Sequence, residues 1–222
     1  MENKTQREMG GTLKVMQYRI INNHMSKYDY LFSNIMRLEG SVYNVDKGLE
    51  QRGIADVIER IITNCYKNHP VAAKFEKRSS KKSTEDYALL DTKTRHLVDI
   101  KSHDVNGTFC MPNLTSIEKL DKLYEQDIKL HYVIVKYSFV NGLLTLLYVN
   151  HCRPHNLPWS NLSIANLGLG QLQISNMHKF SIDRTISKKQ WLNTYHHKIV
   201  DFKYKLLEKT IDAIKKWEEK CD

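Results

Sequence analysis

The dipeptide Asn141-Gly142 is the feature that most constrains the fold of this chain. It lies between two apolar runs, residues 130–140 and 143–149. Asn-Gly favours the tight turn of a two-residue β-hairpin, because both residues accept a positive φ. The sequence therefore predicts two antiparallel strands joined at this turn.

Further strands are expected on either side of this hairpin. The short apolar run 87–90 is followed by a polar, turn-like stretch at 91–95 and by a return strand at 96–101. Another strand-like segment covers residues 171–175. Together these runs indicate a β-sheet.

Helical patterns flank the strands. Apolar residues recur at steps of three and four over residues 11–38 and 52–67, which is typical of amphipathic helices. Pro112-Asn113 is expected to open another helix, and Ser187 with Gln190 has the spacing of a capping box that starts a long C-terminal helix. The apolar stripe of that last helix contains Trp191, Tyr195, Ile199, Phe202, Leu206, Ile211 and Ile214. Strands combined with helices predict an α/β (α+β) fold.

Length and composition exclude several classes of protein. With 222 residues, 41% of them hydrophobic, and only 9 Gly and 4 Pro, the chain is not disordered, and we expect a single domain over residues 1–222. It has no apolar run of the ~20 residues that a membrane helix needs, and its first residues lack the apolar region of a signal peptide. The four scattered cysteines have no CxxC spacing, which indicates a reduced, cytosolic protein.

The formal charge of +9 leaves three kinds of partner open. These are a nucleic acid, an anionic membrane surface, or a neutral partner with an incidental charge excess. The basic run at residues 74–83 fits either a solvated loop or a loop that contacts phosphates.

Two acids and a lysine are expected to meet in the hairpin at 87–101. A turn centred near Lys93 sets residue 86 opposite residue 100, give or take one. Since side chains alternate along a strand, Asp99 and Lys101 share a face and Asp86 can lie beside both. Two nearby carboxylates repel, so a divalent cation or a shared proton must compensate. Such oxygen ligands suit Mg²⁺, and the backbone carbonyl of Ile100 could supply another.

This cluster has a structural and a chemical interpretation. Asp-x-Lys on a strand is usually a surface ion pair of little energetic value. The upstream acid and the apolar neighbours at 87–90 and 97–98 favour chemistry, because polar residues inside an apolar hairpin need a reason. Lys101 would then orient or help to deprotonate an attacking water, in metal-assisted phosphodiester hydrolysis.

Asp86 followed by Asp99-Ile100-Lys101 resembles the PD-(D/E)xK motif of nucleases, with Glu85 in the place of the motif's proline. Downstream, Pro112-Asn113 and Gln171-Leu172-Gln173-Ile174 follow in an order similar to that of type II restriction endonucleases of the HincII/EcoRV blunt-cutting group. The resemblance covers about residues 84–215.

This resemblance implies a restriction-endonuclease-like core, with a central mixed β-sheet flanked by helices, and a long C-terminal helix. Residues 1–70 would be a helical dimerisation part, and residues 84–215 the catalytic and DNA-recognition core. The implied protein is a homodimer that cuts a palindrome in double-stranded DNA to blunt ends. Its cofactor would be Mg²⁺, for which Mn²⁺ could substitute. It would work in the prokaryotic cytoplasm, without a membrane partner, beside a cognate DNA methyltransferase of the same restriction-modification system.

The resemblance also assigns roles to residues. Asp86, Asp99 and the carbonyl of Ile100 would hold the metal, and Lys101 would be the catalytic lysine. Glu59 matches a further acid that some members place on the preceding helix. An ordinary helix acid paired with a neighbour such as Arg60 explains Glu59 equally well.

Polar residues in two regions are candidates for DNA contact. Asn and Gln side chains can bond bidentately to adenine, although a polar loop or a half-exposed strand would have the same composition. The candidates are Ser102, Asn106, Thr108 and Asn113 after the predicted catalytic strand, and Ser160, Asn161, Asn166, Gln171 and Gln173 in the later loop and strand.

Two other functions stay open. A repair or junction nuclease would keep the fold and read DNA structure, and a DNA-binding protein without catalysis would use the acids and the lysine as a structural ion cluster. Zinc is not expected, because the segment 151–155 (His-Cys-Arg-Pro-His) offers at most three ligands and has no second pair at partner spacing.

Overall fold

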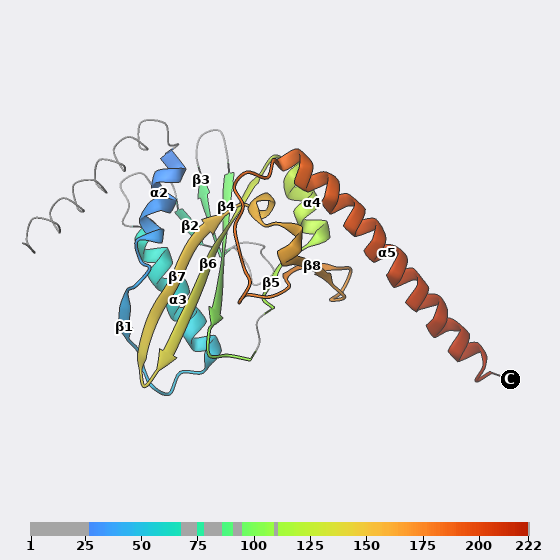
Figure 1. Ribbon diagram of the computed structural model, residues 1–222, viewed down its shortest axis with the longest axis horizontal. Coiled ribbons are helices and arrows are strands. Elements are labelled where there is room, and N and C mark those ends of the chain that lie inside the picture. The colour runs from blue at the N-terminus through green and yellow to red at the C-terminus, as the bar shows by residue number, and fades with distance from the viewer. Residues whose placement is uncertain (1–26, 68–74, 78–85, 91–94, 109–110, 222) are drawn as a thin grey trace, which may run out of the picture.

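A six-stranded mixed β-sheet forms the centre of the chain, with a three-stranded sheet beside it (Figure 1). The strands of the large sheet follow the order β1-β7-β6-β4-β3-β2, and those of the small sheet the order β5-β9-β8. The computed structural model describes residues 27–67, 75–77, 86–90, 95–108 and 111–221. No helix in these ranges combines the length and the apolar character needed to cross a membrane.

The large sheet contains β1 (Val42–Asn44), β2 (Phe75–Lys77), β3 (Tyr87–Leu90), β4 (Arg95–Asp104), β6 (Lys129–Val140) and β7 (Leu143–Cys152). The small sheet contains β5 (Asn113–Ser116), β8 (Leu162–Ala165) and β9 (Gln171–Ile174). The helices are α2 (Lys27–Met36), α3 (Gln51–Lys67), α4 (Ile117–Glu125) and α5 (Lys188–Glu218), with short 3₁₀ turns at Pro154–Asn156 and Trp159–Asn161. Within the large sheet β4 and β6 are parallel and the other neighbours antiparallel, so the sheet is mixed, as predicted.

The predicted hairpin at Asn141-Gly142 is confirmed as the turn between β6 and β7. Both residues have positive φ, 52° and 84°. Gly142 also lies against neighbouring chain: a Cβ there would lie 2.8 Å from Cγ of Lys47 and 3.0 Å from the carbonyl oxygen of Val45. The turn therefore needs glycine for its backbone angle and for its close packing.

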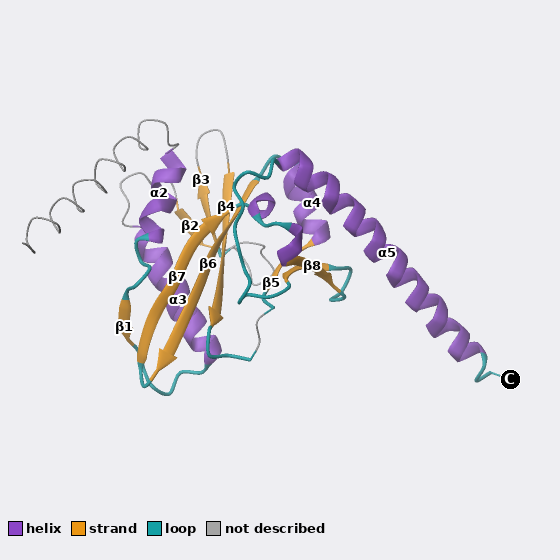
Figure 2. Cartoon of the chain, in the orientation of Figure 1, coloured by secondary structure: helices purple, strands orange, loops and turns teal. Residues whose placement is uncertain are grey.

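Each face of the large sheet is covered by a separate hydrophobic core. Helices α2 and α3 bury Val98 and its neighbours on one face. Helices α4 and α5 and the small sheet bury Leu97 and its neighbours on the other. Figure 2 shows this layered arrangement, with the strands between two groups of helices. Consecutive residues of β4 are buried because the strand is covered on both faces.

Three buried histidines cross the sheet under α2. Nδ1 of His96 lies 2.8 Å from Nε2 of His131, and Nδ1 of His131 lies 2.7 Å from Nε2 of His151. The ring of Phe32 stacks on His151 at 3.6 Å between centroids. Burial lowers the pKa of His131 and His151 well below the usual range, so both rings stay neutral. Cys152, the next residue, belongs to the opposite core, so His151 and Cys152 do not face one site.

The capping box predicted at the start of the last helix is confirmed. The Ser187 hydroxyl accepts from the Gln190 amide at 3.3 Å, and the Gln190 side chain accepts from the Ser187 amide at 3.4 Å. Trp191 anchors the helix, because its buried indole N–H donates to the carbonyl of Leu157 at 2.8 Å. From residue 207 onward every described side chain of α5 is exposed, and Figure 1 shows this end of the helix projecting from the body.

Two local predictions need correction. The helix expected from Pro112-Asn113 begins only at Ile117, because residues 113–116 pair with β9 as a strand. Ser116 is the N-cap and accepts from the amide of Lys119 at 3.4 Å. The later loop that carries Asn161 and Asn166 contains a strand, β8, between these two residues. Residues 11–26 of the first predicted helix, and most of the basic run at 74–83, lie outside the described residues; Phe75–Lys77 form β2.

Candidate active site

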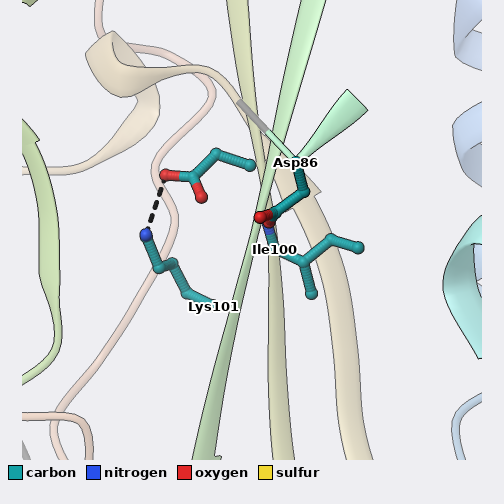
Figure 3. Close-up of polar contacts among 4 residues, drawn as sticks. Asp86, Ile100 and Lys101 are labelled. Carbon is teal, nitrogen blue, oxygen red and sulfur yellow. Dashed lines mark hydrogen bonds and ion pairs between the residues drawn. The ribbon is translucent and has the colours of Figure 1, made fainter. Parts of the chain in front are cut away.

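Strands β3 and β4 bring Asp86 to the middle of β4. Tyr87 pairs with Val98, which sets residue 86 opposite residue 99, within the one-residue margin of the sequence prediction. The amide of Asp86 donates to the carbonyl of Val98 at 3.0 Å. Oδ2 of Asp86 accepts from the amide of Ile100 at 2.7 Å, and Figure 3 shows this carboxylate against the Ile100 backbone. The short strand pair thus fixes the Asp86 carboxylate beside the next acid on β4.

Asp99 and Lys101 form an ion pair on one face of β4. Nζ of Lys101 lies 2.9 Å from Oδ2 of Asp99, as the dashed line in Figure 3 marks. Asp99 is only 4% exposed, whereas the Lys101 side chain is 22% exposed. The pair lies on the face that carries Leu97, towards α4 and the small sheet, because side chains alternate along the strand. A buried acid is thereby linked to a lysine that reaches solvent.

Burial dominates the electrostatics of this group. It raises the pKa of Asp99 to about 7, while the Lys101 ammonium lowers it and the Asp86 carboxylate raises it again. The lysine therefore compensates the buried charge only in part. No well-aligned hydrogen bond reaches Oδ2 of Asp99 from the described residues. A further positive charge beside this carboxylate would stabilise its ionised form.

Tyr132 is a neighbour of Asp99 that the sequence did not single out. It pairs with Asp99 in the parallel register of β4 and β6, and it is fully buried. Within the described part of the chain its hydroxyl has no hydrogen-bond partner. Burial, with the Asp99 charge second, raises its pKa well above the usual range, so the phenol stays protonated. The site therefore has an unused hydroxyl on the strand next to the acid.

The acids fit a hard divalent cation that keeps much of its water. Asp86 and Asp99 supply carboxylate oxygens from adjacent strands, and Asp99 lacks full charge compensation. Mg²⁺ commonly binds through one or two carboxylates with several waters. Among the described residues no group of three or more His, Cys, Asp or Glu side chains could hold a metal ion. A magnesium site here would thus use these two acids, a backbone oxygen such as that of Ile100, and water.

Glu59 lies on the other side of the sheet. It is half-buried on α3, whose residues Ile58 and Ile62 pack into the core that contains Val98. Asp99 belongs to the opposite face of β4. Helix α3 therefore packs on the face of the sheet opposite Asp99. A catalytic role for Glu59 stays a prediction.

The candidates expected after the catalytic strand lie in two environments, because β4 continues to Asp104 and includes Ser102. Ser102 is half-buried on β4 and alternates to the face opposite Lys101. Asn106 and Thr108 are exposed in the turn after the strand. The Asn106 amide group donates to the hydroxyl of Ser138 at 3.0 Å.

Several candidates for base recognition also hold the small sheet together. The Gln173 amide group donates to Oδ1 of Asn113 at 3.1 Å and to the carbonyl of Met111 at 2.9 Å. Asn161 is buried and donates to the carbonyl of Ser181 at 3.0 Å. These polar groups have partners within the chain.

The remaining candidates are more accessible. Ser160 and Asn166 are exposed, and Gln171 is half-buried. Gly170 stands beside them, but a Cβ there would lie 2.8 Å from the Phe202 ring and 2.9 Å from Ile117. Close packing against α5 therefore explains this glycine.

Comparison with known proteins supports the fold. No family model matches the chain, and no curated protein sequence matches it. Forty-five chains of solved structures match it. One of them is NlaIV restriction endonuclease, with 12% sequence identity and a TM-score of 0.50 over 72% of this chain and 73% of that chain. The chain has a restriction-endonuclease-like fold, which confirms the predicted fold class.

Proposed function

We propose that this chain is a metal-dependent endonuclease that hydrolyses phosphodiester bonds of double-stranded DNA. The observation that carries the proposal is the group of Asp86, Asp99 and Lys101 on adjacent strands of a restriction-endonuclease-like fold. A structural ion pair needs no second carboxylate beside a buried one, since that addition raises the electrostatic cost.

Each member of the group has a role in this reaction. Asp86 and Asp99 bind Mg²⁺, which when bound lowers the pKa of a water and offsets charge on the phosphate. Lys101, held by its ion pair with Asp99, orients the attacking water at the exposed end of the group and attracts the scissile phosphate. The fixed strand pairing keeps the acids in place before DNA binds.

The finer proposal is a type II enzyme of a restriction-modification system, acting as a homodimer on a short palindrome. A two-fold protein matches the two-fold symmetry of such a site and brings one active site to each strand. The charge of +9 per chain supports attraction to phosphates. The exposed polar groups of Ser160 and Asn166 are available for contact beside the small sheet. Blunt ends rest on the resemblance to the HincII/EcoRV group alone.

Incubation with long DNA of known sequence, with Mg²⁺ and with EDTA, tests the proposal on a gel. We expect discrete fragments only with Mg²⁺, and sequencing of their ends gives the site and the cut positions. A smear, or cutting confined to branched or damaged DNA, would favour a repair or junction nuclease. Intact DNA together with a salt-sensitive shift in binding would contradict catalysis.

A matched pair of variants guards against a contaminating nuclease. Lys101→Ala should abolish the fragments, whereas Lys122→Ala, which removes a lysine on the surface of α4, should leave them unchanged. Equal cleavage by both variants would attribute the activity to another protein.

A further inference from the structure

The outer face of α5 carries a second apolar stripe that nothing in the described chain covers. Val200, Tyr204, Leu207, Ile211 and Ile214 are between 42% and 64% exposed. They succeed one another at steps of four, three, four and three residues. A repeat of 3.5 residues is the spacing of a coiled-coil seam.

This stripe is distinct from the face that anchors the helix, so the prediction that Ile211 and Ile214 continue the stripe of Trp191 and Tyr195 was wrong. Trp191 and Tyr195 are fully buried against the body, and Phe202 packs on the same core. At about 100° per residue, the outer stripe is centred roughly 160° around the helix from those anchors. The helix thus has one apolar face for its own domain and another with no use within the described chain.

We propose that the outer stripe pairs with the same stripe of a second copy of this chain, as a parallel two-helix coiled coil. A C₂ interface of this kind uses one self-complementary surface twice. The exposed parts of the stripe and of the adjacent Trp217 amount to about 1,200 Å² over two chains, which reaches the lower bound of specific interfaces.

Charge at the Leu207 layer favours the parallel orientation. Lys203 precedes the Leu207 layer on one flank of the stripe, and Glu208 follows it on the other. The exposed Lys203 ammonium also donates to the carbonyl of Leu169 at 3.1 Å, a bond that it would share or exchange on pairing. In a parallel pair Lys203 of one copy faces Glu208 of the second copy, twice over. In an antiparallel pair with the same apolar layers, Glu208 of one copy would face Glu208 of the second copy across the two-fold axis. At the Leu207 layer unlike charges meet in the first arrangement and like charges in the second; one heptad away, Asp201 would face Lys215 in the second.

The side chains of α2 and α3 that the structure describes leave little apolar surface for such a role. Leu31, Phe32 and Ile35 of α2 are at most 2% exposed, and Ile54, Ile58 and Ile62 of α3 are equally buried in the chain's own core. The homodimer belongs to the proposed function, and this inference assigns it a surface. Its test measures mass, so it can fail or succeed independently of DNA cleavage.

Sedimentation or light scattering on the full chain tests the pairing. The parent should have twice its chain mass of 26.1 kDa, about 52 kDa. Leu207→Glu with Ile214→Glu should give the single-chain mass with unchanged helix content. Lys209→Glu with Lys216→Glu introduces two glutamates on the opposite face of the helix, and this control variant should stay dimeric. A parent that is monomeric, for example because another segment of the same chain covers the stripe, overturns the proposal, as does a dimer that survives the first pair of changes.

Cys221 reports the orientation. It is exposed and continues the series Val200, Leu207, Ile214 at intervals of seven. In a parallel pair the two Cys221 thiols come together, so mild oxidation should give a covalent dimer on a non-reducing gel. Cys221→Ser should abolish that band, and so should the Leu207→Glu, Ile214→Glu variant. A dimer in solution that never cross-links through Cys221 would contradict the parallel arrangement.

Discussion

Replacing Asp99 by Asn should stabilise the metal-free protein, and the gain should grow as the pH rises. Asp99 is buried, and its pKa is raised from 3.8 to about 7. The folded state therefore binds the Asp99 proton more tightly than the unfolded chain does. Stability from this group is present at low pH and is lost as the pH rises between about 4 and 7.

The size of the effect follows from the shift. The rise in the pKa of Asp99 corresponds to a loss of about 4 kcal/mol in the free energy of unfolding at high pH, of which about 2–3 kcal/mol falls between pH 5 and pH 8. The side-chain amide that Asp99→Asn introduces does not titrate, so the variant escapes this loss. The buried His131 and His151 titrate with the opposite sign, because burial lowers their pKa values. The contribution of these histidines is the same in both proteins, so it cancels when the free energy of unfolding of the parent is subtracted from that of the variant.

Urea unfolding of both proteins at pH 5 and pH 8, in EDTA, measures this difference. We expect the stability of Asp99→Asn relative to the parent to increase by about 2–3 kcal/mol from the lower to the higher pH. A difference that does not change with pH would refute the assignment of a buried carboxylate whose charge is only partly compensated.

Mg²⁺ should narrow this difference in stability at pH 8. At ten times its dissociation constant, a bound metal stabilises the parent by about 1.4 kcal/mol, or about 3–6 °C in Tm. Asp99→Asn should show no such shift. Equal stabilisation of both proteins by Mg²⁺ would place the metal elsewhere.

Three other substitutions test the fold. Gly142→Ala should lower the free energy of unfolding by about 1–3 kcal/mol, because the positive φ is strained and the methyl group meets Lys47 and Val45; urea titration measures it. Trp191→Ala should cost about 3–5 kcal/mol in the same assay, since it removes a buried anchor of α5. Ser187→Ala removes the cap of α5 and should cost about 1 kcal/mol, seen as a Tm lowered by about 2–4 °C. An unchanged midpoint for any of them would refute the role given to that residue.

Features encoded by neighbouring residues were predictable from the sequence. Asn141-Gly142 specifies its own turn, and Ser187 with Gln190 specifies its own cap. The approach of Asp86 to Asp99 was predictable to within one residue, because a short hairpin allows few registers. These features depend on local backbone chemistry and need no knowledge of distant segments.

Features that depend on distant pairing were not predictable. Residues 113–116 became a strand because β9, more than fifty residues later, supplies their partners. Tyr132 lies beside Asp99 only through the parallel register of β4 and β6, which no local pattern specifies. Gln173 looks like a free polar side chain in the sequence, yet its amide group holds Asn113. In each case tertiary contacts set the conformation or the hydrogen-bond partners of a residue, which local propensity does not specify.

The most direct test of the central proposal is the cleavage rate of a DNA fragment that the parent cuts, measured for Asp99→Ala and Lys101→Ala beside the affinity of each variant for the same DNA. We expect cleavage to fall at least ~100-fold in both variants, as for loss of a group that acts in the transition state, with binding close to that of the parent. Cleavage within a few-fold of the parent in either variant would contradict the assignment of β3 and β4 as the hydrolytic centre.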